Sequence, residues 1–282
     1  MRTHHNIYIG DNREALKHID TNSIDLIVTS PPYSDLKNYG NEPNQIGYGQ
    51  TYEDYLRDLE HVFTLCYSIL KPNRRLCINV GDVFFTKNKD TVHKILPVGA
   101  DIIHILCKIG FGYCGDIIWS KYANGKGAGG STVVMGSFPY PYSGLIQLDY
   151  EHIIVAYKPE SYNQKDCKID KDVKEISKLS TDEWKRYFDG IWHINGDRQN
   201  DHPAKFPIEI PKRLIKMFSF VGDVILDPFL GSGTTSIAAK MLDRNSIGIE
   251  LHDGYKEVIR RKIHDSALSK LLTPCEVNFH VV

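Results

Sequence analysis

The segment Val224-Ile-Leu-Asp-Pro-Phe-Leu-Gly-Ser-Gly-Thr-Thr235 is the most informative stretch of the chain. Its first residues are apolar and end at Asp227, which predicts a buried strand. Gly231 and Gly233 then form a turn before a helix that is expected to begin near Thr234. Such a turn lets a ligand approach the backbone closely and directs helix N–H groups at an anionic group. The segment therefore predicts a cofactor site between a strand and a helix.

Two other glycine-turn motifs do not fit this segment. A phosphate-binding loop needs a lysine before the Ser/Thr, and a dinucleotide fingerprint needs Gly or Ala where Ser236 stands. Further along the chain, the predicted strand Ser246–Ile249 runs into Glu250. Glu250 follows Gly233 at close to the spacing of about 20 residues at which an acidic residue accepts ribose hydroxyls. The combination favours a cofactor that carries a ribose.

Strands and helices are expected to alternate around this segment, which favours one α/β domain over residues 1–282 with a doubly wound, mostly parallel, seven-stranded sheet. The helical spacing of apolar residues predicts helices over Tyr55–Leu70, Val98–Ile109 and Pro207–Phe220. The seven expected strands are Asn6–Ile9, Ile24–Thr29, Leu76–Val80, Asp116–Trp119, His152–Tyr157, Val224–Asp227 and Ser246–Ile249.

Two stretches interrupt this alternation and are interpreted as insertions. Residues 121–147 are rich in Gly, Ser, Pro and Tyr and show neither helical nor strand periodicity, as in a long functional loop. Residues 160–200 are dense in charged side chains, with one short helix that is expected to be capped by Ser180 or Thr181. Both are candidates for recognition loops.

Composition excludes several classes of protein. The 282 residues carry a formal net charge of −1, so contact with a polyanion depends on local groups such as Lys256, Arg260, Arg261 and Lys262, which also fit a solvated helix face. The six cysteines show no zinc-ligand spacing, and we expect no metal site. No apolar run approaches the roughly 18 residues of a membrane span. These features predict a reduced, cytoplasmic protein without a membrane segment.

A second motif lies in Asp25-Leu-Ile-Val-Thr-Ser-Pro-Pro-Tyr33. Two prolines after a strand by themselves indicate only that the strand ends. Together with Asp227–Thr235, however, Ser30–Tyr33 resembles the amino-methyltransferases that act on DNA, whose catalytic motif is Asp/Asn/Ser-Pro-Pro-Tyr/Phe and whose cofactor motif is Asp-Pro-Phe-x-Gly-Ser-Gly-Thr. The catalytic motif comes first here, which is the permuted order of the beta class of this family.

The resemblance implies a Rossmann-like methyltransferase fold, S-adenosylmethionine as cofactor and duplex DNA as substrate, with the target base extruded from the helix. Ser30 Oγ and the Pro31 carbonyl would accept the two amine hydrogens of the base, the rigid Pro31-Pro32 pair would fix their direction, and Tyr33 would stack on the ring. The residues implied in cofactor binding are Asp11, Asn12, Lys205, Asp227, Pro228, Phe229, Gly231, Ser232, Gly233, Thr234 and Glu250.

The acceptor atom is predicted from the first position of the catalytic motif. Two features resemble cytosine-N4 enzymes of restriction-modification systems: Ser30 after Thr29, and His-Pro-Ala-x-Phe-Pro at 202–207. The resemblance implies a cognate restriction endonuclease and a homodimer as possible partners. Adenine N6 is the alternative. There are three remoter alternatives: a carbon-5 enzyme with Cys275 as nucleophile, a dinucleotide oxidoreductase, and a nucleic-acid-binding module without catalysis. Against the first of these, Cys275 is interpreted as a tail residue.

Overall fold

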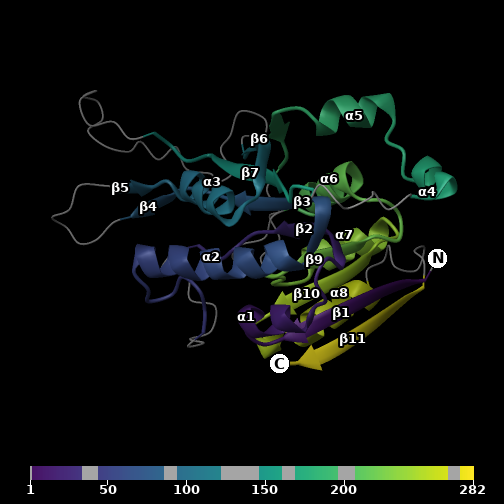
Figure 1. Ribbon diagram of the computed structural model, residues 1–282, viewed down its shortest axis with the longest axis horizontal. Coiled ribbons are helices and arrows are strands. Elements are labelled where there is room, and N and C mark those ends of the chain that lie inside the picture. Colours follow the sequence, from purple (N-terminus) through teal and green to yellow (C-terminus); the bar gives the residue numbers. More distant parts are fainter. Residues whose placement is uncertain are drawn as a thin grey trace.

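The computed structural model describes residues 2–33, 44–85, 94–121, 146–160, 169–195, 207–265 and 274–282. Within these residues nine strands form one sheet in the order β11-β1-β10-β9-β2-β3-β7-β6-β8 (Figure 1). The strands are β1 Thr3–Ile9, β2 Ile24–Thr29, β3 Leu70–Val80, β6 Gly112–Ser120, β7 Tyr150–Tyr157, β8 Ile191–His193, β9 Val224–Asp227, β10 Asn245–Glu250 and β11 Cys275–Val281. A separate hairpin pairs β4 Val83–Phe85 with β5 Lys94–Leu96.

The sheet is mostly parallel, as predicted. Only the pairs β3–β7 and β7–β6 are antiparallel among its described strands. All seven predicted strands are present, and the described part of the chain adds two at the edges of the sheet, β8 and β11. Cys275 is therefore not a tail residue, because it begins β11 opposite Thr3 of β1. Val277 and Phe279 of the same strand pack against the cluster formed by Ile7, Ile9 and α8 (Lys256–Asp265).

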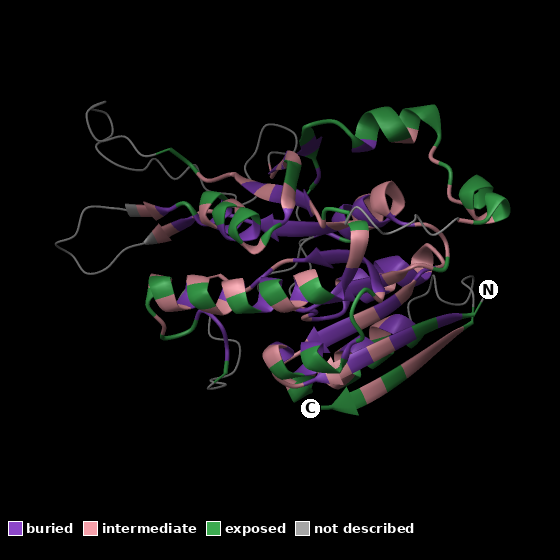
Figure 2. Cartoon of the chain, in the orientation of Figure 1, coloured by how far each residue is buried: buried purple, intermediate pink, exposed green. Residues whose placement is uncertain are grey.

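Helices cover both faces of the sheet because its central strands are apolar on both sides. β2 is buried at every position, as expected for a parallel strand between two helical layers. On one face it packs with α2 (Tyr52–Ile69) and α3 (Val98–Ile109), and on the other with α6 (Glu209–Phe218) and α7 (Thr234–Met241). The buried residues accordingly run along the middle of the molecule (Figure 2).

The local sequence accounts for where these helices begin and end. The Thr51 side chain accepts a hydrogen bond from the Asp54 amide at the start of α2, and α3 ends at Gly110 in the left-handed conformation. In the second insertion, α5 (Thr181–Tyr187) is capped by Ser180, whose hydroxyl and backbone pair reciprocally with Glu183. The predicted helices are thus confirmed, although α6 is shorter than the range 207–220.

The topology separates the two ends of the sheet. β1, β10, β9, β2 and β3 are mutually parallel, so their carboxyl ends meet at one edge. α4 (Lys171–Ile176) and α5 precede β8, which runs in the same direction as β3, and therefore lie toward the opposite edge (Figure 1). Among the described residues of the 160–200 insertion, those at the end of β8 lie toward the carboxyl edge.

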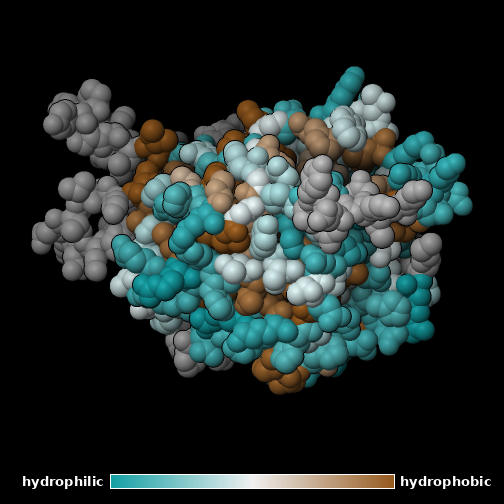
Figure 3. Space-filling model, in the orientation of Figure 1, coloured by the Kyte–Doolittle hydropathy of each residue, from teal (hydrophilic) through white to brown (hydrophobic). Residues whose placement is uncertain are grey.

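The face of the molecule seen in Figure 3 is largely hydrophilic, with apolar side chains exposed in small groups. Among the described helices, none combines the length and the apolar character that a membrane span requires.

Candidate active site

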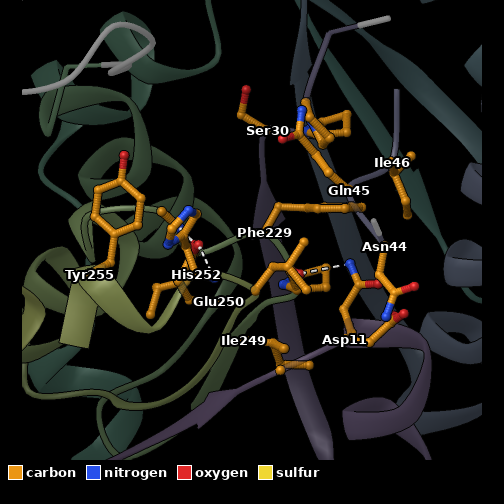
Figure 4. Close-up of a pocket in the computed structure, with 18 of the residues that line it drawn as sticks. Asp11, Ser30, Asn44, Gln45, Ile46, Phe229, Ile249, Glu250, His252 and Tyr255 are labelled. Atoms are coloured by element: carbon orange, nitrogen blue, oxygen red, sulfur yellow. Dashed lines mark hydrogen bonds between the residues drawn. The ribbon is translucent and has the colours of Figure 1, made fainter. Parts of the chain in front are cut away.

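One cavity opens at the carboxyl edge of the sheet, and it collects both motifs (Figure 4). It measures about 1030 Å³ with its open mouth included. It is formed by the ends of β1, β2 and β10, by the loop after β9, and by a short stretch before α2. Its lining comprises residues 10–12, 30–33, 44–46, 228–232, Thr234, 249–252 and Tyr255. The sequence-predicted residues Asp11 and Glu250 thus meet in one cavity, although they come from opposite ends of the chain.

Asp227, at the end of β9, does not line this cavity. Its side chain is buried, and its carboxylate accepts hydrogen bonds from Thr29 Oγ1 (2.7 Å), Thr235 Oγ1 (2.6 Å) and the Phe229 amide (3.0 Å). Burial raises the pKa of Asp227 to about 6, against the lowering effect of these three donors. The contacts found for Asp227 are thus all within the protein, and its predicted contact with a cofactor stays a prediction. Asp227 joins the end of β2, which precedes Ser30, to the glycine loop and to α7.

Gly233 likewise lies outside the lining of the cavity, and its predicted contact with a cofactor stays a prediction. It occupies the cap position of α7 with a φ of 90°, a conformation that side chains other than glycine rarely adopt. Its role is therefore to form the turn. Gly231, with a φ of 56°, does line the cavity together with Pro228, Phe229, Ser232 and Thr234.

Glu250 lies at the end of β10 with its carboxylate at the cavity. The Gly231 amide donates to one carboxylate oxygen (2.8 Å) and the His252 amide to the other (2.9 Å). Burial raises the pKa of Glu250 to about 7 despite these two donors. Each carboxylate oxygen retains acceptor capacity, so the group is oriented to accept a pair of vicinal hydroxyls.

Cofactor affinity is expected to increase about tenfold between about pH 6 and about pH 8. Two hydroxyl donors favour the ionised carboxylate, and a group with a pKa of about 7 becomes ionised across this range. The affinity gained on ionisation is therefore lost as the pH falls through 7. Calorimetric titration with S-adenosylmethionine at several pH values measures the change. Glu250→Gln is the control, and an equally steep pH dependence in that variant would contradict the assignment.

Asp11 and Asn12 position the two sides of the cavity relative to each other. Asn12 Nδ2 donates to the Pro228 carbonyl (3.0 Å) and so ties the segment after β1 to the loop after β9. The Asp11 carboxylate accepts from the Arg13 amide (2.9 Å) and forms an ion pair with its guanidinium (2.6 Å). Arg13 also lies 3.3 Å from an Asp58 carboxylate oxygen of α2. Sequence reasoning missed Arg13, because its link to Asp58 joins two elements that are distant in the chain.

The predicted catalytic motif Ser30–Tyr33 lines the same cavity as Glu250 (Figure 4). The hydroxyl of Tyr55, a fully buried residue of α2, donates to the Pro32 carbonyl (3.0 Å) and holds the proline pair in place. Tyr55 was predicted only as a core residue of the helix. A tyrosine at a core position needs a hydrogen-bond partner for its hydroxyl, and this requirement was the available signal.

The stretch from Ser34 to Gln50 follows directly on Ser30–Tyr33 in the chain. Its first part, 34–43, lies outside the described residues, whereas Asn44, Gln45 and Ile46 line the cavity. Gln50 accepts from the Gly47 amide (2.8 Å) and donates to Asp58 (2.7 Å). The described part is thus anchored to α2.

Several predicted positions lie outside the described residues. These are Lys205 with the preceding part of its motif, most of the 121–147 insertion, and residues 161–168 and 196–200 of the second. In the part of the chain that the structure describes, no group of three or more His, Cys, Asp or Glu side chains is arranged to hold a metal ion.

The parallel sheet and the cavity at its carboxyl edge, with an acidic residue and a glycine turn at adjacent strand ends, define a Rossmann-like methyltransferase fold. The family model described as "DNA methylase", which covers N6 and N4 methyltransferases, matches residues 24–261. The chain belongs to this DNA methylase family.

Individual relatives agree with the family assignment. The chain is 35% identical to the type II methyltransferase M.MjaI of Methanocaldococcus jannaschii, over 93% of this chain and 92% of the relative. It is also similar to the crystal structure of TTHA0409 of Thermus thermophilus, assigned as a DNA modification methylase and complexed with S-adenosyl-L-methionine, at 34% identity and a TM-score of 0.73 over 97% and 99% of the two chains. The cytosine-N4-specific PvuII DNA methyltransferase shares the fold, with 18% identity, a TM-score of 0.61 and coverage of 94% and 95%.

Proposed function

We propose that the protein is a site-specific DNA methyltransferase that moves a methyl group from S-adenosylmethionine to N4 of a cytosine flipped out of duplex DNA. The observation that carries this proposal is the single cavity shared by Ser30–Tyr33 and by Glu250 with the glycine turn. A cavity with both groups brings a methyl donor and an acceptor base to adjacent positions.

The residues of the cavity fit S-adenosylmethionine. The Glu250 carboxylate suits the two ribose hydroxyls, and Phe229 and Ile249 offer apolar surface on the same side of the cavity for the adenine ring. The loop at Gly231 leaves open space where a side chain would otherwise stand. TTHA0409, whose sequence is similar over nearly the whole chain, was crystallised with this cofactor. When bound, S-adenosylmethionine supplies a methyl group that is already activated on a sulfonium.

The chain must therefore provide position rather than a covalent intermediate. The exocyclic amine of a base is a weak nucleophile because its lone pair is delocalised into the ring. Ser30 Oγ and the Pro31 carbonyl accept the two amine hydrogens and orient the lone pair toward the methyl group. Tyr33 stacks on the extruded ring. The Tyr55 hydroxyl and the Thr29–Asp227 hydrogen bond hold this segment from either side.

Serine at position 30 favours cytosine N4 as the acceptor, and adenine N6 is the second candidate because the family contains both types. The position of Cys275, the candidate nucleophile, does not support a carbon-5 mechanism. Cys275 pairs with Thr3 at the amino end of β1, whereas the cavity lies at the carboxyl ends of the strands. A module without catalysis would not require both motifs in one cavity.

Duplex DNA is the proposed partner, and the domain has the permuted order with its catalytic motif first. We assign recognition to 121–147 and to the part of 160–200 that follows β8, since these segments leave the sheet at the cavity edge. The names of relatives such as M.MjaI support a type II restriction-modification system with a cognate endonuclease in the cytoplasm. A homodimer remains part of this proposal.

The test is nucleoside mass spectrometry of DNA incubated with the protein and labelled S-adenosylmethionine, followed by sequencing of the methylated positions. N4-methylcytosine is the expected product. N6-methyladenine would transfer the proposal to the second candidate, 5-methylcytosine would contradict the mechanism, and the absence of any labelled base in DNA would contradict the function.

A further inference from the structure

Three polar side chains meet beside the candidate active site but outside the cavity lining, and we call Asn79, Lys121 and Glu151 the Glu151 cluster. Asn79 Nδ2 donates to one oxygen of the Glu151 carboxylate (2.6 Å), and Lys121 Nζ forms an ion pair with the other. Asn79 and Glu151 are buried, with 3% and 7% of their surface exposed. Asn79 of β3, Glu151 of β7 and Lys121, which directly follows β6, lie at the same sheet edge as the end of β2.

The cluster lies next to the catalytic motif because residue 81 is a glycine. A Cβ at Gly81 would lie 3.1 Å from Glu151 Cγ and 3.6 Å from the Tyr33 hydroxyl oxygen. Tyr33 and Glu151 therefore approach the backbone of Gly81 together. The cluster thus borders the position at which Tyr33 is proposed to stack on the base.

Stability alone does not account for this arrangement. A buried ion pair is often no more stabilising than apolar residues of similar volume, because both charges lose their hydration. The carboxylate of Glu151 can only accept, so Asn79 must turn its nitrogen toward it. Asn79 Oδ1 is then buried with no hydrogen-bond partner among the described residues. An incomplete buried network of this kind calls for a functional explanation.

Lys121 is the member of the cluster that can reach a ligand. Its side chain is 28% exposed, and its ammonium has three N–H donors, of which the Glu151 ion pair engages one. The ammonium also lies 5.4 Å from the centre of the Trp119 ring, and the Lys121 amide donates to the Asp149 carbonyl. These contacts hold the Lys121 ammonium, a hydrogen-bond donor, in a fixed position beside Glu151.

A flipped base needs such a donor. Stacking on Tyr33 fixes the plane of the ring, and Ser30 and Pro31 hold the amine, but the ring can still pivot in its plane about that amine. The ring nitrogen next to the amine-bearing carbon is an acceptor in both candidate bases, N3 in cytosine and N1 in adenine. A hydrogen bond to this nitrogen stops the pivot.

We infer that Lys121, held by Glu151 and Asn79, donates a hydrogen bond to this ring nitrogen and so sets the orientation of the target base. The inference rests on the proposed function, but it holds for either acceptor base. Lys121 is in this sense a substrate-binding residue, whereas Glu151 and Asn79 are positioning residues.

The experiment compares methylation of two duplexes that carry the methylation site established by sequencing, one with the natural target base and one with its deaza analogue, 3-deazacytosine or 1-deazaadenine. Lys121→Met should lower kcat/KM on the natural base by about 10- to 100-fold, as for the loss of a charged hydrogen bond. Wild type should lose a similar factor on the analogue. On the analogue duplex, Lys121→Met should be no slower than the wild type, because the substitution and the analogue remove the same hydrogen bond.

Lys108→Met is the matched control, because Lys108 forms an exposed ion pair with Glu60 and should keep wild-type kinetics on both duplexes. Calorimetric affinity for S-adenosylmethionine and the melting temperature report folding. If Lys121→Met does not fold, Glu151→Gln replaces it. This variant should lose less of its kcat/KM on the natural base, and on the analogue it should match the wild type.

The inference would be overturned if the effects of Lys121→Met and of the analogue on kcat/KM multiplied. It would also be overturned if Lys121→Met had the kcat/KM of the wild type on the natural base. An equal loss of affinity for every DNA, whatever the target base, would show a phosphate contact and would overturn it as well. Failure of the wild type to methylate either duplex would instead contradict the proposed function.

Discussion

Ser30→Ala is expected to lose most methyl transfer while its affinity for S-adenosylmethionine stays close to that of the wild type. Ser30 lines the cavity beside Pro31, and its hydroxyl is proposed to accept a hydrogen from the base amine. This contact tightens as the amine becomes tetrahedral, so its loss lowers kcat and kcat/KM together. By analogy with a single oxyanion-hole donor, the loss should be about 10²-fold or more.

Single-turnover methylation of duplex DNA and calorimetric cofactor titration measure the two parts of this prediction. Ser23→Ala is the matched control, because Ser23 stands just before β2, where its hydroxyl donates to the Asp20 carbonyl, whereas Ser30 stands just after the same strand. The control should retain nearly full activity. A Ser30→Ala enzyme of comparable rate would remove the serine from the mechanism.

Asp227→Ala should destabilise the fold strongly, and it should also weaken cofactor binding. The substitution leaves the Thr29 and Thr235 hydroxyls and the Phe229 amide without their shared acceptor in a buried site. Each unsatisfied buried group costs about 1–3 kcal/mol, and the two hydroxyls can partly re-pair, so the free energy of unfolding should fall by about 2–5 kcal/mol.

Urea unfolding gives the stability change, and cofactor titration under native conditions gives the binding change. Asp227→Asn is the informative comparison. Its amide oxygen can still accept from Thr29 and Phe229 while the Thr235 hydroxyl turns to accept from the amide nitrogen, so less than half of the loss is expected. Equal stability of Asp227→Ala and the wild type would show that the hydrogen bonds to the Asp227 carboxylate do not stabilise the fold.

The elements of the fold follow from short-range patterns. β2 is predictable because the consecutive apolar residues Leu26, Ile27 and Val28 are suited to burial on both faces, and α5 because Ser180 and Glu183 form a local capping box. The meeting of Ser30 and Glu250 in one cavity also follows, since carboxyl ends of parallel strands share an edge. Periodicity and capping act over a few residues, and a single sequence displays both.

The interactions that hold the site together do not follow from such patterns. Asp227 belongs to the predicted cofactor motif, yet its carboxylate turns to Thr29, 198 residues away, and leaves the cavity lining. Arg13, Tyr55 and the Glu151 cluster act across elements that no spacing connects. Which buried polar group meets which partner depends on how strands and helices pack in three dimensions, because desolvation makes each such group take whatever partner the packing brings within reach.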